Sequence, residues 1–518
     1  MPFMESLPCE GCDDHIQAIR FIAFDQLWLR SSIIRDADKD RDLIVFVENH
    51  EKLRGKRWHI QRIFFLIASA RHFALSLVES GYRVRYLKSE SFESAFSEID
   101  SLFPNSKGAS RIAMQPASIR LNRTLRECGF EITASDLFLT PREVFAEWAT
   151  SKKSLLMENF YRAQRTRLNI LMDGNQPLGG AWNLDHENRL PPPKGYQWPP
   201  YLEHHRDEID QEVLSELRAN FPNLWGDDPT GTWATTRTGA LRQLQHFLDH
   251  HLTGFGPLED AMPRSEESWQ VHHSLLSPYL NNGLLHPQEV LDGAIERFEA
   301  GDVPLSSIEG FVRQIIGWRE YVHGIYWYFG ERYRHENQLN AHRSLLPLFH
   351  EPEKTEMSCV RGIVTDIRER SWVHHIPRLM VLSNLALLAA IEPEEFLDWM
   401  SEVFIDAYDW VMVPNVIGMG VHADGGRMMT KPYAAGGAYI SRMSNYCKGC
   451  VFDPKTRSEP DSCPFTTLYW DFLDRNREEF KRNHRIAQQV RGLDRLKDLD
   501  QLKVRAEEVL ERLSLGKL

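Results

Sequence analysis

Three features typical of secreted and membrane proteins are missing from this sequence. No apolar run reaches the roughly 18 residues that span a bilayer. Residues 1–15 lack the basic and apolar regions of a signal peptide. Seven cysteines in 518 residues are too few for a secreted disulfide framework. We therefore expect a cytoplasmic monomer with no membrane partner.

A strong positive charge is also missing. The net charge is −12, which excludes attraction of nucleic acid over the whole surface. Residues 427–485 differ, because they hold 11 Lys/Arg against 7 Asp/Glu, a net of +4. Aromatic residues are interleaved with these charges: Tyr433, Tyr439, Tyr446, Tyr469 and Trp470. This segment is either a solvated helical surface or a local contact for nucleic acid.

The cysteines that are present form a specific pattern. Cys447, Cys450 and Cys463 follow the spacing C-x2-C-x12-C, and Cys359 lies 88 positions earlier. Four thiolates suit an iron–sulfur cluster, and a Cys-Pro pair such as Cys463-Pro464 often ends a bacterial cluster run. Structural zinc also accepts four cysteines but usually takes two CxxC pairs. A cluster, zinc and free thiols therefore all stay open from spacing alone.

The N-terminal part alternates between short apolar runs and helical patterns. Residues 19–24, 43–47, 84–87 and 111–114 read as strands, with amphipathic stretches at 57–79 and 118–128 between and after them. This alternation predicts a parallel sheet covered by helices. Ligands bind at the carboxyl ends of such strands, where Asp25 and Glu48 follow two of them.

The rest of the chain divides into a connection and a helical region. Residues 150–235 include Gly179-Gly180 and the proline-rich segment 191–200, which is typical of a connection that wraps a surface. From about residue 236 the pattern is helical, with neither repeats nor notable strand alternation. We predict a flexible tail at 1–18, an α/β domain at 19–140, a linker at 141–235 and an all-α domain at 236–518. The pair Cys9 and Cys12 in the tail reads as coincidental.

Four helical segments carry more polar groups than a core needs. Residues 272–283 place small hydroxyls near a helix start, where backbone N–H groups bind phosphate. Arg319 lies beside Trp318, and arginine binds phosphate bidentately. Residues 374–380 hold two histidines and an arginine, and residues 405–415 hold two aspartates and an asparagine among aromatic residues. Singly each is ordinary, but together they predict a ligand site.

In this order, the segments SLLS, GWRE, HHIPRLM and DAYDW resemble the flavin-binding core of the photolyase/cryptochrome family. The four cysteines, with RQIIGWREY, PNVIGM, KPYAA, NYCKGC and LYWDFL, are similar to the iron–sulfur bacterial cryptochromes and (6-4) photolyases. The resemblance covers nearly everything after residue 19. It implies a Rossmann-like α/β domain followed by an all-α FAD-binding domain that carries a [4Fe–4S] cluster.

The resemblance also implies site residues. The positions that match the FAD contacts are His273, Ser274, Leu275, Leu276, Ser277, Trp318, Arg319, His375, Arg378, Asp406, Asp409 and Asn415. The cluster ligands would be Cys359, Cys447, Cys450 and Cys463. Relatives carry a 6,7-dimethyl-8-ribityllumazine antenna in the N-terminal domain, and Asp25 and Glu48 match its polar contacts.

The implied activity is light-dependent repair of (6-4) photoproducts in UV-damaged DNA. The lesion is flipped out of the duplex, excited reduced flavin supplies an electron, and a proton donor assists the rearrangement. His375 matches the family's catalytic histidine, and Tyr433 matches its companion at the lesion. His374 reads as a packing neighbour.

The electron route departs from the family pattern. Trp399 matches the flavin-proximal electron carrier, but Met400 and Glu351 occupy positions that hold aromatic residues in relatives. Trp372, Tyr408 or Trp410 would then have to supply another route, or photoreduction is slow. The remaining alternatives are a blue-light photoreceptor of the same family and a non-photochemical DNA-binding module with a structural cluster.

Overall fold

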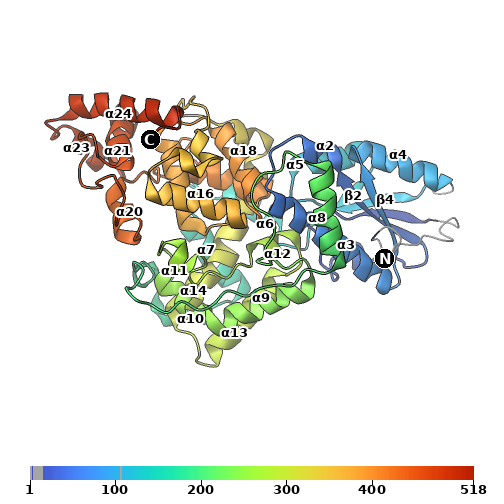
Figure 1. Ribbon diagram of the computed structural model, residues 1–518. Helices are drawn as coiled ribbons and strands as arrows, with labels where there is room; N and C mark the ends of the chain where they lie inside the picture. The colour runs from blue at the N-terminus through green and yellow to red at the C-terminus, as the bar shows by residue number, and fades with distance from the viewer. Residues whose placement is uncertain (1–2, 4–15, 105–107) are drawn as a thin grey trace.

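The computed structural model describes residue 3, residues 16–104 and residues 108–518. Cys9 and Cys12 lie outside these residues, as does most of the tail expected at 1–18. In the described part of the chain, no helix combines the length and apolarity needed to cross a bilayer. The molecule is elongated, with a sheet-containing region at one end and a helical region at the other (Figure 1).

The N-terminal region is built on a five-stranded parallel sheet. Its strands are β1 (Ala18–Phe21), β2 (Asp42–Asn49), β3 (Arg83–Ser89), β4 (Ser110–Met114) and β5 (Glu131–Thr133), in the order β3-β2-β1-β4-β5. This order is that of a doubly wound α/β fold, with its switch point between β1 and β4. The alternation in the sequence predicted the first four strands. The three-residue β5 is too short to show a pattern.

Both faces of this sheet are covered, because successive side chains of a strand point to opposite sides. Ile44 and Phe46 pack with α3 (Ile60–Glu79) on one face. Val45 and Val47 pack on the other face with α4 (Phe92–Leu102) and α5 (Ile119–Glu127). The apolar run of β2 is therefore that of a strand buried on both sides.

Residues 141–235, the expected linker, contain ordered elements. They are α6 (Arg142–Thr150), α7 (Met157–Leu168), the hairpin β6 (Met172–Asp173) and β7 (Gln176–Pro177), the short turns η3 (Leu178–Gly180) and η4 (Asp185–Glu187), and α8 (Glu208–Asn220). Helix α8 returns to the α/β region, where Val213 and Leu217 pack on Ile63 and Ile67 of α3 (Figure 1). The connection thus packs on the α/β region through α8 and on the helical region through α6 and α7.

The remainder is helical, as the sequence predicted. The short helices α1 (Ser32–Arg35) and α2 (His50–Arg54) belong to the α/β region. The helical region begins with α9 (Arg237–His250), α10 (Leu252–Leu258), α11 (Ser265–Ser268), α12 (Ser277–Asn282), α13 (Pro287–Glu299) and α14 (Leu305–Val312). The central group is η5 (Arg313–Arg319), α15 (Glu320–Phe329), η6 (Glu331–His335), η7 (Pro347–Phe349), η8 (Pro352–Lys354), α16 (Ser358–Arg370), η9 (Pro377–Ser383), α17 (Asn384–Leu388), α18 (Pro393–Val403), α19 (Asp409–Val413) and η10 (Pro414–Gly420).

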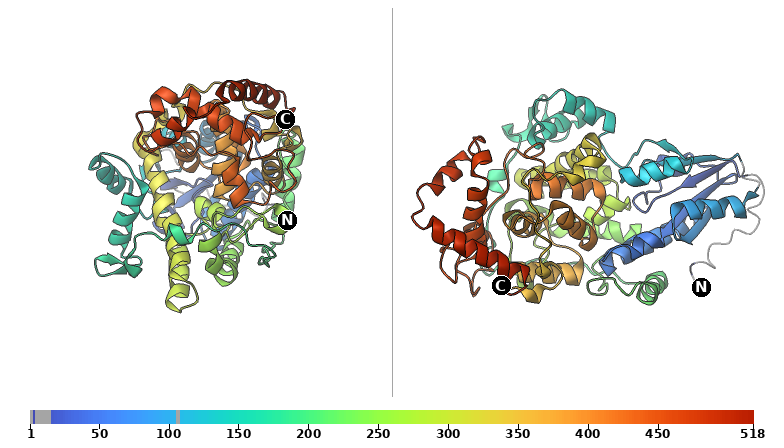
Figure 2. Two further views of the ribbon diagram at one scale, coloured as in Figure 1. Left: turned by 90° about the vertical axis from the view of Figure 1, so that its left-hand side faces the viewer. Right: turned by 90° about the horizontal axis from the view of Figure 1, so that it is seen from above.

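The C-terminal helices form the end of the molecule opposite the sheet. They are α20 (Gly437–Met443), α21 (Pro464–Arg475), α22 (Arg477–Phe480), α23 (Ala487–Leu493) and α24 (Leu499–Ser514), and Figure 2 shows them farthest from the strands. Phe465, Leu468 and Phe472 of α21 bury one face of that helix in the main core of the helical region. This packing fixes the segment 437–463, which carries three of the four clustered cysteines.

Candidate cofactor-binding and active site

A large cavity of about 820 Å³ lies in the middle of the helical region. Three of the segments around it, η5, η9 and η10, are π-helical. Such wide turns are rare and are often found at functional sites. They carry Trp318 and Arg319, Arg378, and Asn415, which all line the cavity. The sequence therefore places its polar residues on the segments where the backbone departs from a regular α-helix.

An ion pair holds one side of the cavity together. The Arg378 guanidinium donates to both carboxylate oxygens of Asp406, at 2.8 and 3.1 Å. The Ser277 hydroxyl donates to the same carboxylate at 2.7 Å, and Asn281 donates to the Asp406 carbonyl at 2.9 Å. This network joins η9, α12 and the loop before α19. Bidentate pairs of this kind fix orientation as well as charge.

A second arginine lines the cavity on η5. Arg319 is buried and donates to Glu320 at 2.7 Å, and its guanidinium lies over the Phe138 ring at 4.2 Å. Its Nε has no hydrogen-bond partner. Burial in this apolar setting lowers the pKa of Arg319, and Glu320 opposes that effect. A buried cation with a free donor suits an anionic ligand.

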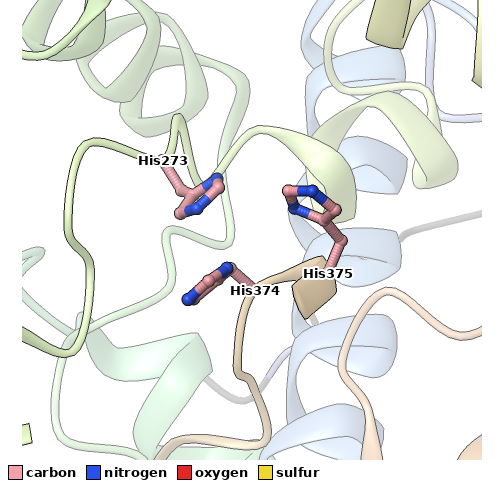
Figure 3. Close-up of side chains that lie close together, drawn as sticks. All are labelled: His273, His374 and His375. Atoms are coloured by element: carbon pink, nitrogen blue, oxygen red, sulfur yellow. The ribbon is translucent and has the colours of Figure 1, made fainter. Parts of the chain in front are cut away.

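Histidines occupy another part of the cavity wall. Half of the His375 side chain is exposed, but the exposed half faces the cavity. The atoms around it desolvate the ring and lower the pKa of His375 to about 4, with a further contribution from Arg378. Its Nε2 lies 3.7 Å from Asp260, whose own pKa burial raises to about 6. His375 is therefore neutral at neutral pH. Figure 3 shows it grouped with His273 and His374.

Most of the flavin-contact residues expected from the sequence line this cavity. They are His273, Ser274, Leu275, Ser277, Trp318, Arg319, His375, Arg378, Asp406 and Asn415. Tyr433, expected beside the lesion, also lines it. The loop before α12 has an unusual backbone, because Leu275 has a φ of 57°. A non-glycine residue in the left-handed region is uncommon, and such strain is frequent at binding sites.

Two expected contacts are not in the lining. Leu276 packs instead into the core shared with the α/β region. Asp409 points toward the α/β region, where it accepts from Ser118 at 3.1 Å and pairs with Arg120 at 3.1 Å. Asp409 begins α19, whereas Asp406 lies in the preceding loop, so the two side chains leave the backbone in different directions.

The proposed electron carriers are divided between the cavity and the core. Trp399 is buried, donates to the Phe349 carbonyl at 3.0 Å and packs on that ring at 4.7 Å. Met400 lines the cavity, whereas Glu351 is half exposed. Of the alternatives, Trp372 and Trp410 line the cavity and Tyr408 is not among its lining residues.

The four cysteines lie together about a second, smaller pocket. Cys359 comes from α16, and Cys447, Cys450 and Cys463 come from the segment between α20 and α21. None is in a disulfide. Burial and the neighbouring thiols raise the pKa of Cys463 to about 12, so this sulfur would ionise only beside a cation. A Cβ at Gly437 would lie 2.9 Å from the Cys463 sulfur, which indicates that this position must stay small.

At the carboxyl edge of the sheet, the two expected antenna residues are both buried. Tyr86 donates to Glu48 at 2.7 Å and Arg71 donates to it at 3.0 Å. Burial opposes ionisation of Glu48, but His50, Arg71 and Tyr86 keep its pKa low. Asp25 accepts from the Ala117 amide at 2.7 Å, and its Oδ1 has no partner. Burial raises the pKa of Asp25 to about 6.

Sequence reasoning missed an acidic and basic group beside the histidines. Glu259, Asp260 and Arg313 line the cavity. Arg313 begins the segment RQIIGWREY but was not among the expected site residues, and the segment of Glu259 and Asp260 carries no recognisable pattern. Burial raises the pKa of Glu259 to about 8, so it is largely protonated at neutral pH. Arg313 donates to Glu309 at 3.2 Å and lies 3.8 Å from Glu259. These residues come together only through the tertiary structure.

The chain is similar to known proteins over nearly all of its length. A family model described as deoxyribodipyrimidine photo-lyase-related protein matches residues 20–233. A (6-4) photolyase from Agrobacterium fabrum is 42% identical over 480 residues, which are 90% of this chain and 93% of the relative. The chain belongs to the photolyase/cryptochrome family. Membership in this family implies FAD as the cofactor.

Solved structures of photolyase/cryptochrome proteins share the fold. A class III photolyase from Agrobacterium tumefaciens superposes with a TM-score of 0.55 at 17% identity, covering 97% of each chain. A cryptochrome from Synechocystis sp. PCC6803 superposes with a TM-score of 0.52 at 15% identity, covering 79% of this chain and 83% of the other. The photolyase/cryptochrome fold therefore accounts for both the parallel sheet and the helical region.

Proposed function

We propose that this protein is a (6-4) photolyase, which repairs (6-4) photoproducts in DNA by light-driven electron transfer from reduced FAD. The observation that carries this proposal is the 42% identity to a (6-4) photolyase over 93% of that relative. The cavity supports it, because its volume is in the upper part of the range of roughly 300–1,000 Å³ typical for ligand sites.

The kinds of residue on the cavity lining support FAD as the ligand. Arg378 and Asp406 would orient the flavin ring through the network that also fixes Ser277. Arg319 offers an unpartnered, buried Nε to an anionic part of the cofactor. When bound and reduced, FAD supplies the electron for repair. Methionines and valines elsewhere on the lining, such as Met412 and Val416, exclude water.

His375 is the residue that we assign to proton transfer. It reaches the cavity from the loop before η9 and faces Asp260 at 3.7 Å. In the free protein its lowered pKa keeps it neutral, so it is not a strong acid by itself. Negative charge on a bound lesion would favour the protonated ring and raise that pKa. Tyr433, also on the lining, would hydrogen-bond the lesion beside it.

DNA binding would use the basic side chains on and near the cavity lining. Arg442 lines the cavity, and Lys431 is exposed two residues before Tyr433. Such contacts to phosphate are electrostatic and weaken with salt. The lesion would be flipped into the cavity, at a lower cost than a normal base because it stacks poorly.

We assign a [4Fe–4S] cluster to Cys359, Cys447, Cys450 and Cys463, and a ribityllumazine antenna to the sheet edge near Asp25 and Glu48. The four sulfurs line one pocket, which supports the cluster. The Oδ1 of Asp25 has no hydrogen-bond partner and would accept a hydrogen bond from the antenna. The carboxylate of Glu48 already accepts hydrogen bonds from Arg71 and Tyr86, so it has less capacity to bond the antenna.

The cluster assignment is tested by iron and sulfide content. Cys447→Ser should lose the iron, whereas Cys128→Ser should keep it, because Cys128 is a free cysteine of the α/β region away from the four. Zinc in place of iron in the anaerobically purified protein would show a structural zinc site and refute the cluster.

Repair is tested with reduced protein, blue light and an oligonucleotide that contains one (6-4) lesion. His375→Ala should lower the repair yield by at least about a hundredfold, the usual value of a lost proton donor, while the FAD absorption stays. His342→Ala is the control, since that side chain is 72% exposed. Undiminished repair by His375→Ala would remove this residue from the mechanism, and no repair by the wild type would favour a photoreceptor.

A further inference from the structure

Three histidines meet at the wall of the cavity. One ring nitrogen from each of His273, His374 and His375 lies within 4.8 Å of the other two. The rings of His273 and His374 are stacked, with centroids 4.3 Å apart and planes 20° from parallel. His375 stands nearly perpendicular to His273 at 5.5 Å. Figure 3 shows the three rings around one small space, with a nitrogen of each ring directed toward it.

Two of these rings offer a buried nitrogen to a ligand. The Glu259 backbone lies beside the His273 ring, and the Ala261 backbone lies beside the His374 ring. A neutral imidazole carries a lone pair on one of its two nitrogens. Nε2 of His273 and Nδ1 of His374 are buried and have no hydrogen-bond partner. Both residues are more than nine-tenths buried.

This arrangement is the one that protein metal sites use for imidazole ligands. A metal-binding histidine almost always donates its second ring nitrogen to a carbonyl or carboxylate, which fixes both tautomer and direction. Groups of this kind lie beside the three rings: the backbone of Glu259 and of Ala261 beside His273 and His374, and the Asp260 carboxylate 3.7 Å from Nε2 of His375. Three imidazoles suit zinc, nickel, cobalt and copper, and they suit magnesium or calcium poorly.

We propose that His273, His374 and His375 bind one divalent transition-metal ion, with zinc as the reference ion. A tetrahedral zinc with bonds of roughly 2.0–2.1 Å needs ligand nitrogens about 3.4 Å apart. The nitrogens within 4.8 Å of one another reach that spacing by small rotations of the three side chains. Because half of the His375 side chain is exposed to the cavity, the fourth coordination position opens there.

The consequence for activity rests on the proposed function. A nitrogen of His375 that is bonded to zinc cannot exchange a proton with the lesion. Zinc is therefore a reversible inhibitor of repair, acting at the proton donor and leaving FAD in place. A chelator such as EDTA restores activity because the metal bond, unlike a covalent modification, dissociates.

Zinc binding is measured by calorimetric titration of the complete FAD-loaded protein, without DNA or light. The wild type should bind one zinc ion at this site, and His273→Gln and His374→Gln should each weaken that binding at least tenfold. The matched control is His272→Gln, because His272 is the buried neighbour of His273 but bonds Tyr196 at 3.0 Å, away from the cluster. This control should bind zinc within twofold of the wild type. Any zinc held by the four cysteines adds equally to every variant and leaves the differences unchanged.

Anomalous scattering from zinc-soaked crystals of the wild type gives an answer that does not depend on the variants folding. A peak between the three rings supports the site. A peak only at His72, Asp207 and Asp210, another group of suitable spacing in the described part of the chain, overturns it. Equal zinc affinity in all four proteins overturns it as well. Because binding is read without repair, failure of the repair chemistry would refute the proposed function and leave the metal site standing.

Discussion

The cavity of the helical region and the edge of the sheet are both built around buried charges, but they differ in what their polar atoms lack. At the cavity, Arg319, His273 and His374 each keep a buried atom without a partner. At the sheet edge, Oδ1 of Asp25 also lacks a partner, but the Glu48 carboxylate is already bonded to Arg71 and Tyr86. Unsatisfied buried polar groups are costly, so they persist where a ligand completes them. The difference marks the cavity as built for a ligand and Glu48 as part of the fold.

The largest expected effect contrasts two aspartates three positions apart. Asp406→Asn should lower FAD affinity by at least about hundredfold, because it leaves the Arg378 charge without its buried partner, which typically costs about 3–5 kcal/mol. Asp409→Asn should retain FAD, since Asp409 pairs with the half-exposed Arg120 instead. Flavin content after dialysis measures both. Equal flavin loss in the two variants would place Asp409 at the flavin site after all.

The next effect concerns Glu48, whose loss should change stability rather than cofactor content. Glu48→Gln should lower the free energy of unfolding by about 3 kcal/mol, because the buried Arg71 loses a charged partner. Urea denaturation, followed by circular dichroism, measures this. Glu90→Gln is the control, as that acid is exposed and pairs with the exposed Arg54. If Glu48→Gln instead removes a bound antenna without loss of stability, Glu48 is a ligand contact, and the sheet edge resembles the cavity in being built for a ligand.

A smaller effect appears in the pH dependence of stability. The folded pKa of His375, about 4, lies below the value of about 6.5 expected in the unfolded chain. Between those values the unfolded state binds the proton, so stability falls as pH is lowered from about 6.5 to 4. His375→Gln should reduce this slope, by less than the about 1.4 kcal/mol per pH unit of a fully buried group. Urea midpoints at pH 7 and pH 5 measure the change, and an unaltered slope would contradict the lowered pKa.

The smallest effect belongs to Asp25. Its folded pKa of about 6 is raised, so it contributes stability at low pH that is lost as pH rises from about 4 to 6. Asp25→Asn removes this loss but also weakens the bond to the Ala117 amide, and the net change at pH 7 should stay within about 1 kcal/mol. Thermal melts at pH 4.5 and pH 7 measure it. A loss of several kcal/mol would show that Asp25 is as structural as Glu48.

Sequence patterns predicted the first four strands and the helical region because both rest on the local periodicity of apolar residues, and most of the flavin contacts that the family resemblance implied line the cavity. The cysteine pattern grouped Cys359 with the three cysteines of the distant C-terminal segment. The exceptions depend on backbone direction and tertiary contacts. Asp409 turns away because α19 begins at that residue, and Leu276 follows Leu275, whose left-handed backbone redirects the chain. The partner of Glu48 could not be predicted, since Arg71 comes from the next long helix.

The π-helical segments make the cavity sensitive to chain length as well as to side-chain identity. Each π turn holds one residue more than an α turn, so a one-residue deletion would restore a regular helix. Everything after the deletion would then rotate by about 100° around the helix axis. A deletion inside η5 before Arg319 would thus turn Arg319 away from the cavity, and a deletion inside η9 or η10 would turn the residues that follow Arg378 or Asn415, although only one side chain had been lost. Homologues that lack one residue in these segments have to reach a cofactor by different side chains, whatever their overall identity to this protein.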